Sequence, residues 1–256
     1  MTTKKDVQSQ FGRSAKAYVS SDLHKLGKDL SLLLEIANIK GKEKLLDVAT
    51  GGGHTANAFA PFVQEVTALD LTPEMLAVAK DFIESNGFQN VNFVEGDAEA
   101  LPFAEDAFDI ITCRIAPHHF PHIDQFITEV YRTLKPGGQF LLDDNIAPED
   151  EKSDQFYNTI EKERDYSHFR AWKKTEWIQK LEAVGFNIEV FHRFEKTFEF
   201  DSWCERMQVT PATKEKLNTF ILHVPDQLKQ KFQIQMTDDR VLSFTGEAMV
   251  LKAIKA

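Results

Sequence analysis

Three consecutive glycines, Gly51 to Gly53, stand between the apolar stretch KLLDVA (residues 44–49) and a helical pattern that begins GGHTANAFA. Glycine has no side chain, so a ligand can come close to the backbone there and the chain can adopt angles that other residues avoid. A glycine-rich turn from a strand into a helix typically receives a nucleotide, whereas a plain turn would need one glycine rather than three. The loop therefore predicts a nucleotide site, although it does not by itself identify the nucleotide.

Charged side chains end the next predicted strands. VTALDL carries Asp70, which lies 19 positions after Gly51, VNFVEGD ends at Asp97, and FDIITCRI reaches Arg114. Ligands of an open parallel sheet bind at the carboxyl ends of its strands, and a carboxylate at the position of Asp70 can accept both hydroxyls of a ribose. Each carboxylate alone could be an ordinary turn residue. Together with Asp47 at the end of the first strand, they indicate one binding site.

These residues must be positioned by the strands and helices that alternate along residues 44–145. Such alternation indicates a parallel sheet with helices on both faces. Beyond residue 146 the pattern changes, and segments 146–180 and 201–235 are helical or irregular. Two long strands, NIEVFHRFEKTFEF and RVLSFTGEAMVLKAIK, indicate an antiparallel pair at one side of the sheet. We expect one domain over residues 1–256, in which residues 1 to about 10 look frayed in isolation.

The ordered set of motifs resembles the class I methyltransferases that use S-adenosylmethionine, and most closely the branch that includes the ubiquinone/menaquinone C-methyltransferases. The resemblance rests on LLDVATGGG, VTALDLTPEML, VNFVEGDAEALPFAEDAFDIITC and EVYRTLKPGGQFLL, in that order, within residues 44–142. Each motif alone is weak, whereas the ordered set is specific. It implies an α/β fold with a Rossmann-like, doubly wound, mostly parallel sheet of seven strands, whose last strand is antiparallel and inserted near the edge. Residues 44–145 would then form the cofactor-binding core, and segments 146–180 and 201–235 would be helical additions on the acceptor side.

The resemblance also implies roles for the residues of the loop. Asp47, with the loop through Gly51 and Gly53, would lie under the methionine part of the cofactor, and Asp70 would hold the ribose hydroxyls. Ala49 stands where the family commonly has a glycine. This change permits binding if Ala49 keeps a negative φ.

Further roles follow for the adenine and the N-terminus. Leu71 and Met75 would line the adenine, Asp97 would accept from its amino group, and the Ala98 backbone would lie beside the ring. FGRSAKAYVSSD resembles the family's Phe-x-x-x-Ala-x-x-Tyr pattern, which puts Tyr18 near the methionine end and makes residues 11–38 a helical lid. The cofactor-binding residues expected on this basis are Tyr18, Asp47, Ala49, Gly51, Gly53, Asp70, Leu71, Met75, Asp97, Ala98 and Arg114.

The run PHHFPH follows the fourth predicted strand and contains His118, His119 and His122. Its two prolines interrupt any regular helix, and no repeat of carboxylates accompanies the histidines, so no metal site is predicted. Residues just past this strand should border the transferred methyl group, where a neutral imidazole could take a phenolic or enolic proton. We expect His119 to be the general base, with His118 as the second candidate and His122 or Asp144 as the orienting group. A solvated loop without a catalytic role is the alternative.

The composition is that of an ordinary globular protein, with 42% hydrophobic residues. Thirty Lys and Arg against 40 Asp and Glu give a formal net charge of −10, which argues against nucleic acid as a partner. Cys113 and Cys204 are far apart and lack the spacing of metal ligands, which is typical of a reducing compartment. No stretch approaches the length of a membrane span, so we expect a cytoplasmic protein without integral membrane association.

We therefore expect S-adenosylmethionine-dependent methyl transfer to a small or medium organic acceptor, at carbon or oxygen. An NAD(P)-dependent oxidoreductase is the main alternative, because GGGHTA at residues 51–56 fits the pattern G-x-G-x-x-A and Asp70 lies near the expected ribose position. A cofactor-binding module without catalytic activity is the other alternative. The sequence leaves open the acceptor, the accepting atom and the oligomeric state.

Overall fold

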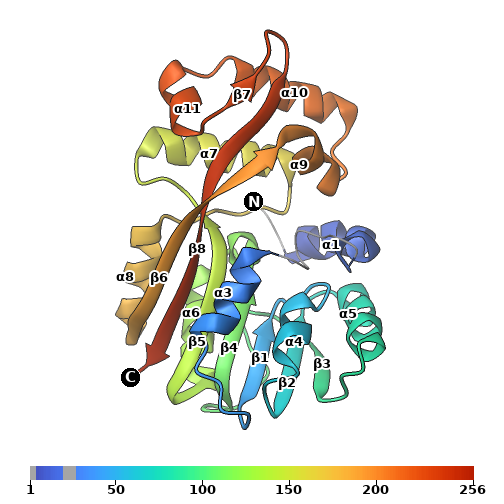
Figure 1. The fold of residues 1–256 in the computed structure, drawn as a ribbon, viewed down its shortest axis with the longest axis vertical. Coiled ribbons are helices and arrows are strands. Elements are labelled where there is room, and N and C mark those ends of the chain that lie inside the picture. Colours follow the sequence, from blue (N-terminus) through green and yellow to red (C-terminus); the bar gives the residue numbers. More distant parts are fainter. Residues whose placement is uncertain (1–3, 20–26) are drawn as a thin grey trace.

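The computed structural model describes residues 4–19 and 27–256, apart from the side chains of residues 13–19. At its centre is a mixed sheet in the order β3-β2-β1-β4-β5-β8-β6, with a short β7 paired to β8 (Figure 1). The strands are β1 (Lys44–Val48), β2 (Glu65–Asp70), β3 (Val91–Glu95), β4 (Phe108–Arg114), β5 (Leu134–Ile146), β6 (Phe186–Glu199), β7 (Gln235–Met236) and β8 (Val241–Lys255).

The pairing of these strands confirms the predicted sheet. Strands β1 to β5 pair in parallel, and β8 runs antiparallel to both of its neighbours, β5 and β6. The mostly parallel, Rossmann-like arrangement with its last strand antiparallel and inserted near the edge is therefore present. The described residues form eight strands rather than the expected seven, because β7 adds a two-residue pairing to β8. A strand of two residues is too short to show an alternating pattern in the sequence.

Helices cover both faces of the sheet. Helices α3, α4 and α5 pack on one face, whereas α6 and α8 pack on the other. The helices are α1 (Lys4–Val19), α3 (Lys28–Ile36), α4 (His54–Phe59), α5 (Pro73–Ser85), α6 (Ile123–Thr133), α7 (Glu151–Arg164), α8 (Lys174–Val184), α9 (Phe200–Arg206), α10 (Pro211–Leu222) and α11 (Asp226–Lys231), with a 3-10 turn at Pro117–His119. None of the helices in the described ranges is both long and apolar enough to cross a membrane.

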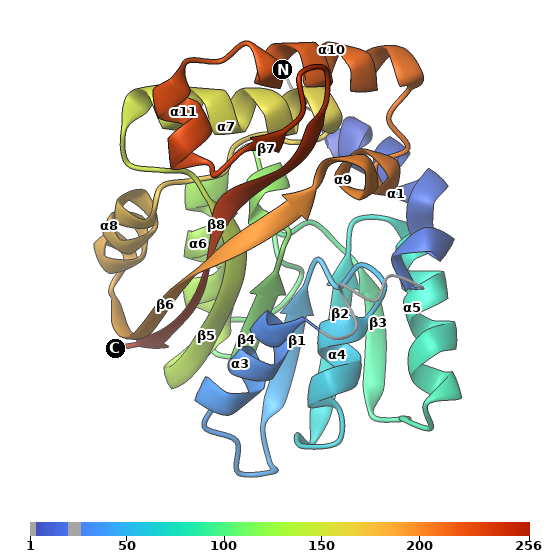
Figure 2. The same ribbon diagram turned by 45° about the horizontal axis from the view of Figure 1, so that its top comes forward.

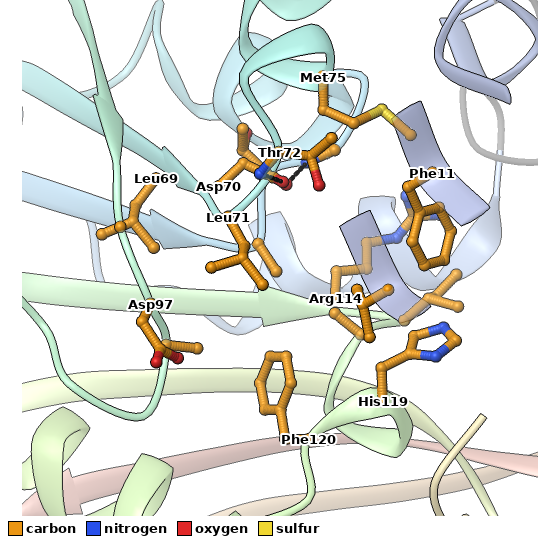
Figure 3. Close-up of a pocket in the computed structure, with 18 of the residues that line it drawn as sticks. Phe11, Leu69, Asp70, Leu71, Thr72, Met75, Asp97, Arg114, His119 and Phe120 are labelled. Atoms are coloured by element: carbon orange, nitrogen blue, oxygen red, sulfur yellow. Dashed lines mark hydrogen bonds between the residues drawn. The ribbon is translucent and has the colours of Figure 1, made fainter. Parts of the chain in front are cut away.

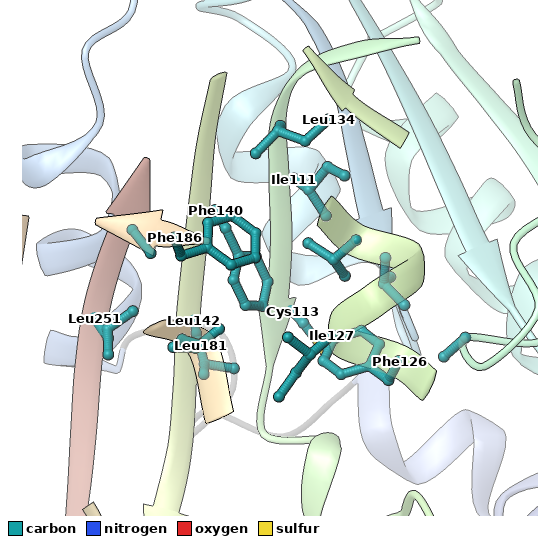
Figure 4. Packing of buried hydrophobic residues seen from close by; sticks show 14 of the residues in the cluster. Ile111, Cys113, Phe126, Ile127, Leu134, Phe140, Leu142, Leu181, Phe186 and Leu251 are labelled. Carbon is teal, nitrogen blue, oxygen red and sulfur yellow. The ribbon is translucent and has the colours of Figure 1, made fainter. Parts of the chain in front are cut away.

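The core beneath α6 shows how the sequence pattern becomes packing. The spacing i, i+3, i+4, i+7 puts Ile123, Phe126, Ile127 and Val130 on one stripe of α6, and all four are buried. Phe126 packs on Phe140 of β5, with ring centroids 6.0 Å apart (Figure 4). Strands β4 and β5 are buried over most of their length, as expected for strands covered on both faces. This packing fixes the carboxyl ends of β4 and β5.

Helices α7, α9, α10 and α11 form a separate layer beyond the carboxyl ends of the parallel strands (Figure 1, Figure 2). The layer buries its own aromatic cluster, which includes Tyr157, Trp203, Phe232 and Phe244. The long strands β6 and β8 extend from the sheet into it, and β6 leads directly into α9. These additions therefore enclose the edge of the sheet at which ligands bind.

The N-terminal helix begins earlier than we expected. Residues 1 to about 10 looked frayed from the sequence, but α1 starts at Lys4. The Lys4 ammonium pairs with Asp97, which lies 93 positions away in the chain, and with Glu99. No local pattern can reveal such a contact. Residues 20–26 of the expected lid lie outside the described part of the chain.

Candidate active site

A pocket lies at the carboxyl ends of β1, β2 and β4, and α1 lies over it (Figure 3). We call it the first pocket. Three side chains of α1 contribute to its wall: Lys4, Val7 and Phe11. The free volume is about 120 Å³, which is below the roughly 300–1,000 Å³ of typical ligand sites. In this conformation the free space is therefore smaller than a nucleotide-sized ligand needs.

The glycine loop after β1 presents bare backbone to this pocket. Gly51 has a φ of 53°, and a side chain added there would meet no atom within 4 Å, so the position borders open space. Behind the loop, Asp47 accepts hydrogen bonds from the hydroxyls of Thr50 at 2.6 Å and Thr112 at 2.7 Å. Burial raises the pKa of Asp47 to about 6. Asp47 thus supports the loop from beneath, while Gly53 packs against α5.

Ala49 does not meet the condition of a negative φ, because its φ is 54°. The chain turns sharply here, which lets the Thr50 N–H donate to the Leu69 carbonyl at 2.9 Å. A left-handed conformation costs a residue with a Cβ roughly 1–2 kcal/mol. The position therefore suits glycine, although Ala49 still lines the first pocket.

The carboxylate of Asp70 ends β2 at the wall of the pocket (Figure 3). It accepts the backbone N–H of Gly51 at 2.8 Å and of Thr72 at 2.9 Å. Burial raises the pKa of Asp70 above its ordinary value, and these hydrogen bonds oppose the rise only in part. Each oxygen keeps a further lone pair that can accept from a diol. The apolar side chains of Leu71 and Met75 line the pocket beside it and suit a flat ring.

Asp97 and Ala98 form the wall after β3. Asp97 pairs with Lys4, whose Nζ also lies 2.7 Å from Oε2 of Glu99. The other oxygen of Glu99 accepts the backbone N–H of His122 at 2.6 Å. Lys4 is thus paired with Asp97, the carboxylate that the resemblance assigns to the adenine amino group.

Arg114 reaches from the end of β4 to two buried carboxylates. Its Nε donates to Oδ2 of Asp29 at 2.6 Å and lies 3.5 Å from Oδ2 of Asp143. Burial raises the pKa of Asp29, but the Arg114 guanidinium overcomes this effect, so the pKa lies below its ordinary value. Burial and the neighbouring Asp29 hold the pKa of Asp143 well above the ordinary value. This cluster therefore favours the charged form of Asp29 and the neutral form of Asp143.

A second cavity of about 560 Å³ adjoins the first pocket and is lined by β6, α9 and the loop after α7. Three residues line both spaces, namely Phe11, Ile115 and His119, and they form the junction. Ile115 has a φ of 52°, which is uncommon for a β-branched residue, and its N–H donates to the Asp143 carbonyl at 2.8 Å. Groups bound in the two cavities would meet at this junction.

The ring of His119 is buried at the junction, with the Phe11 ring edge-on at 5.0 Å (Figure 3). Its Nδ1 lies 3.1 Å from the carbonyl oxygen of Ser167. That oxygen can only accept, so the neutral ring carries its proton on Nδ1 and leaves Nε2 as an acceptor. Burial and the neighbouring His118 lower the pKa of His119 to about 4. The ring is neutral at physiological pH.

His118 lines the second cavity but not the first pocket. Its Nδ1 lies 2.6 Å from Oδ1 of Asp144, and its ring centroid lies 4.2 Å from that of His119. Burial lowers the pKa of His118, but Asp144 more than compensates and raises it above the ordinary value. Of the two orienting groups that we expected, Asp144 contacts His118 rather than His119, and His122 is the N-cap of α6. No described group of three or more His, Cys, Asp or Glu could hold a metal ion.

The first pocket brings together most of the site residues expected from the sequence. Its wall includes Ala49, Gly51, Asp70, Leu71, Met75, Asp97, Ala98, Arg114 and His119. Asp47 and Gly53 lie behind the loop, and the side chain of Tyr18 lies outside the described part of the chain. Sequence reasoning missed Lys4, Glu99 and Ile115, for which no motif gave a signal.

Known proteins resemble the chain over the site and beyond it. Residues 46–142 match the model of a family described as a methyltransferase domain. The chain is 38% identical over 250 residues to the uncharacterized methyltransferase YcgJ of Bacillus subtilis (strain 168). The aligned region covers 97% of this chain and 98% of that protein. It is also 34% identical over 145 residues to the ubiquinone/menaquinone biosynthesis C-methyltransferase UbiE of Brucella canis, over 53% of this chain and 54% of that protein.

The similarity extends to solved structures. A crystal structure assigned to a methyltransferase of Bacillus halodurans C-125 superposes with a TM-score of 0.88 at 56% identity, over 90% of this chain and 99% of that one. The crystal structure of YcgJ from Bacillus subtilis gives a TM-score of 0.86 at 37% identity, over 89% of this chain and 97% of that one. The shared fold therefore extends over about nine tenths of the chain.

Proposed function

Because the chain belongs to the S-adenosylmethionine-dependent methyltransferases, we propose that it methylates a small or medium organic acceptor at carbon or oxygen. Its cofactor is S-adenosylmethionine rather than a nicotinamide. A small molecule is favoured over nucleic acid because the net charge is −10. We place the protein in the cytoplasm, since Cys113 and Cys204 are both free thiols.

The residues that line the first pocket suit the separate parts of this cofactor. Gly51 offers bare backbone to the methionine part, and Asp70 offers carboxylate oxygens to the ribose. Leu71 and Met75 provide apolar walls for the adenine, and Asp97 provides an acceptor for its amino group. The other proposed contacts, direct or through the loop, are Tyr18, Asp47, Ala49, Gly53, Ala98 and Arg114.

One observation carries the proposed reaction: His119 lies in the walls of both cavities. Bound in the first pocket, S-adenosylmethionine supplies an electrophilic methyl group that passes in line to a nucleophile. The acceptor would occupy the second cavity, with its nucleophilic atom at the junction of Phe11, Ile115 and His119. These buried side chains would hold the acceptor in line and exclude water.

We propose that His119 is the general base. Its unprotonated Nε2 would accept the proton of the acceptor as the new carbon–oxygen or carbon–carbon bond forms. A pKa of about 4 keeps the ring neutral at physiological pH, but it also makes the ring a weak base. Acceptors with acidic protons are therefore favoured. His118 is the second candidate, because Asp144 fixes its Nδ1 and makes the ring more basic.

The test is a mass-spectrometric screen for methylated product and S-adenosylhomocysteine with a panel of organic acceptors. For any acceptor that turns over, His119→Ala should lower the rate at least about 100-fold, as expected for a lost general base. The affinity for S-adenosylhomocysteine should stay unchanged. His223→Ala, which removes an exposed histidine of the outer layer, is the matched control. A near-normal rate in His119→Ala would show that His119 is not the base. The positioning of acceptor and cofactor in line would then be the only source of catalysis.

A further inference from the structure

The second cavity is lined by a lysine that faces inward from the sheet. Lys196 lies on β6 between Phe194 and Phe198, and the alternation of a strand puts these three residues on one face. Phe198 is buried in the aromatic cluster of the outer layer, and Phe194 packs against the core under the sheet. This face of β6 is therefore the inward one. Lys196 is half-buried and borders the cavity.

The ammonium of Lys196 lacks an anion of its own. Within residues 4–19 and 27–256, its one hydrogen-bond partner is Oδ1 of Asn145, at 3.5 Å, which is the outer limit of such a bond. It lies 5.7 Å from the centroid of the Phe198 ring. No carboxylate oxygen of the described residues lies within 4.0 Å of its Nζ, the distance limit for an ion pair. A partly desolvated ammonium in this position gains most from a negatively charged ligand.

Two buried carboxylates at the cavity, Asp29 and Asp165, do not supply that anion. Asp29 is bound to the Arg114 guanidinium at 2.6 Å. Asp165 accepts the Ser167 hydroxyl at 2.5 Å and the backbone N–H of the same residue at 2.8 Å. Each of these carboxylates is thus already engaged with another partner.

Two carboxylates of β6, Glu195 and Glu199, also border the cavity, but they alternate with Lys196 along the strand and are exposed. Deeper in the protein, Asp29 lies beside two cations, Arg114 and Lys196, both of which lower its pKa. Lys196 is thus a cation on the cavity wall that an acceptor anion can reach.

We propose that the second cavity binds the methyl acceptor as an organic anion whose carboxylate or phosphate contacts Lys196. The apolar body of the acceptor lies against Phe194 and Phe198, and its nucleophilic atom reaches the junction at His119. A cavity of about 560 Å³ accommodates a molecule of this kind. The assignment rests on the proposed role of the second cavity as the acceptor site.

The experiment uses the full chain saturated with S-adenosylhomocysteine and two matched probe pairs: phenylacetate with phenylacetamide, and phenyl phosphate with phenol. Binding is measured by titration calorimetry and ligand-observed NMR. At least one anion should bind about tenfold or more tightly than its neutral partner, because a charged contact is stronger than a neutral one. Lys196→Met should abolish this preference, whereas Lys196→Arg should keep it.

Lys80→Met is the matched control, since Lys80 is exposed on α5, pairs only loosely with Glu84 at 3.8 Å and lines neither cavity. It should bind the probes like the wild type. If Lys196→Met does not fold, as judged by its melting curve, Lys196→Gln replaces it. Equal affinity for anions and their neutral partners, or a preference that survives the loss of Lys196, would overturn the proposal. Failure of the protein to bind S-adenosylhomocysteine would instead count against the proposed function.

Discussion

His118 Nδ1 lies 2.6 Å from Oδ1 of Asp144, and the other oxygen of the same carboxylate accepts the His118 backbone N–H at 2.9 Å. Asp144 is fully buried, so water does not compete for this contact. The carboxylate thereby fixes both the position of the ring and its tautomer. Its effect on His118 can be measured separately from catalysis.

We expect Asp144→Asn to flatten the pH dependence of stability above neutral pH. The pKa of His118 in the folded protein lies above its ordinary value of 6.5 because of Asp144, despite the opposing effect of burial. The His118–Asp144 pair therefore stabilises the fold fully below about pH 6.5, and this contribution is lost as the pH rises through the folded pKa. Urea unfolding of both proteins from pH 5 to 9 measures the difference. If the free energy of unfolding changes with pH in the same way in Asp144→Asn and in the wild type, the pair has no such effect.

Asp70→Ala should weaken binding of S-adenosylhomocysteine by about 1–3 kcal/mol, because the ribose hydroxyls lose a charged acceptor. The unliganded protein should also lose stability, since the N–H groups of Gly51 and Thr72 lose their partner. Calorimetry and thermal unfolding measure the two effects. Asp81→Ala, which removes an exposed carboxylate of α5, should change neither. Unchanged affinity in Asp70→Ala would place the ribose elsewhere.

Ala49→Gly should stabilise the protein by up to about 1 kcal/mol. It relieves a left-handed strain of roughly 1–2 kcal/mol at Ala49, part of which is offset by the roughly 0.5–1 kcal/mol that glycine loses in entropy on folding. The matched control Ala58→Gly lies within α4 and should instead destabilise by about 1 kcal/mol. Chemical denaturation gives both values. A loss of stability in both variants would mean that Ala49 is not strained.

The cofactor should slow hydrogen exchange in α1. This helix borders the first pocket through Lys4, Val7 and Phe11, and the Gln8 amide beside them donates to the Leu71 carbonyl at 2.9 Å. A ligand beneath the helix adds contacts to it and so lowers the frequency of local opening. Exchange followed by mass spectrometry should therefore show residues 11–19 protected by S-adenosylhomocysteine. Equal exchange with and without ligand would contradict a lid.

The sequence alone predicted those parts of the site that depend on local patterns. The glycines at 51–53 follow an apolar strand directly, so their place at the carboxyl end of β1 follows from the neighbouring residues. The same holds for Asp70, which closes β2, and for Asp97, which follows the end of β3 by two residues. The antiparallel last strand, inserted near the edge of the sheet, followed from the resemblance, which the ordered motifs supported.

The remaining features depend on contacts between distant segments. Lys4 meets Asp97 only because α1 folds back over the sheet, and Lys196 enters the second cavity only because β6 extends into the outer layer. The left-handed φ of Ile115 arises where β4 leaves the sheet, and a sequence pattern does not encode it. His118 meets Asp144 because β4 and β5 are paired, which a single sequence shows only after the fold is known.

A crystal structure of the protein with S-adenosylhomocysteine tests the central claim most directly. We predict that the ribose hydroxyls lie on Asp70 and that the sulfur atom faces the junction of Phe11, Ile115 and His119. Lys4 should have left Asp97 to admit the adenine. A sulfur atom that faces away from the second cavity, or a ligand bound outside the first pocket, would contradict the assignment of the two cavities to cofactor and acceptor.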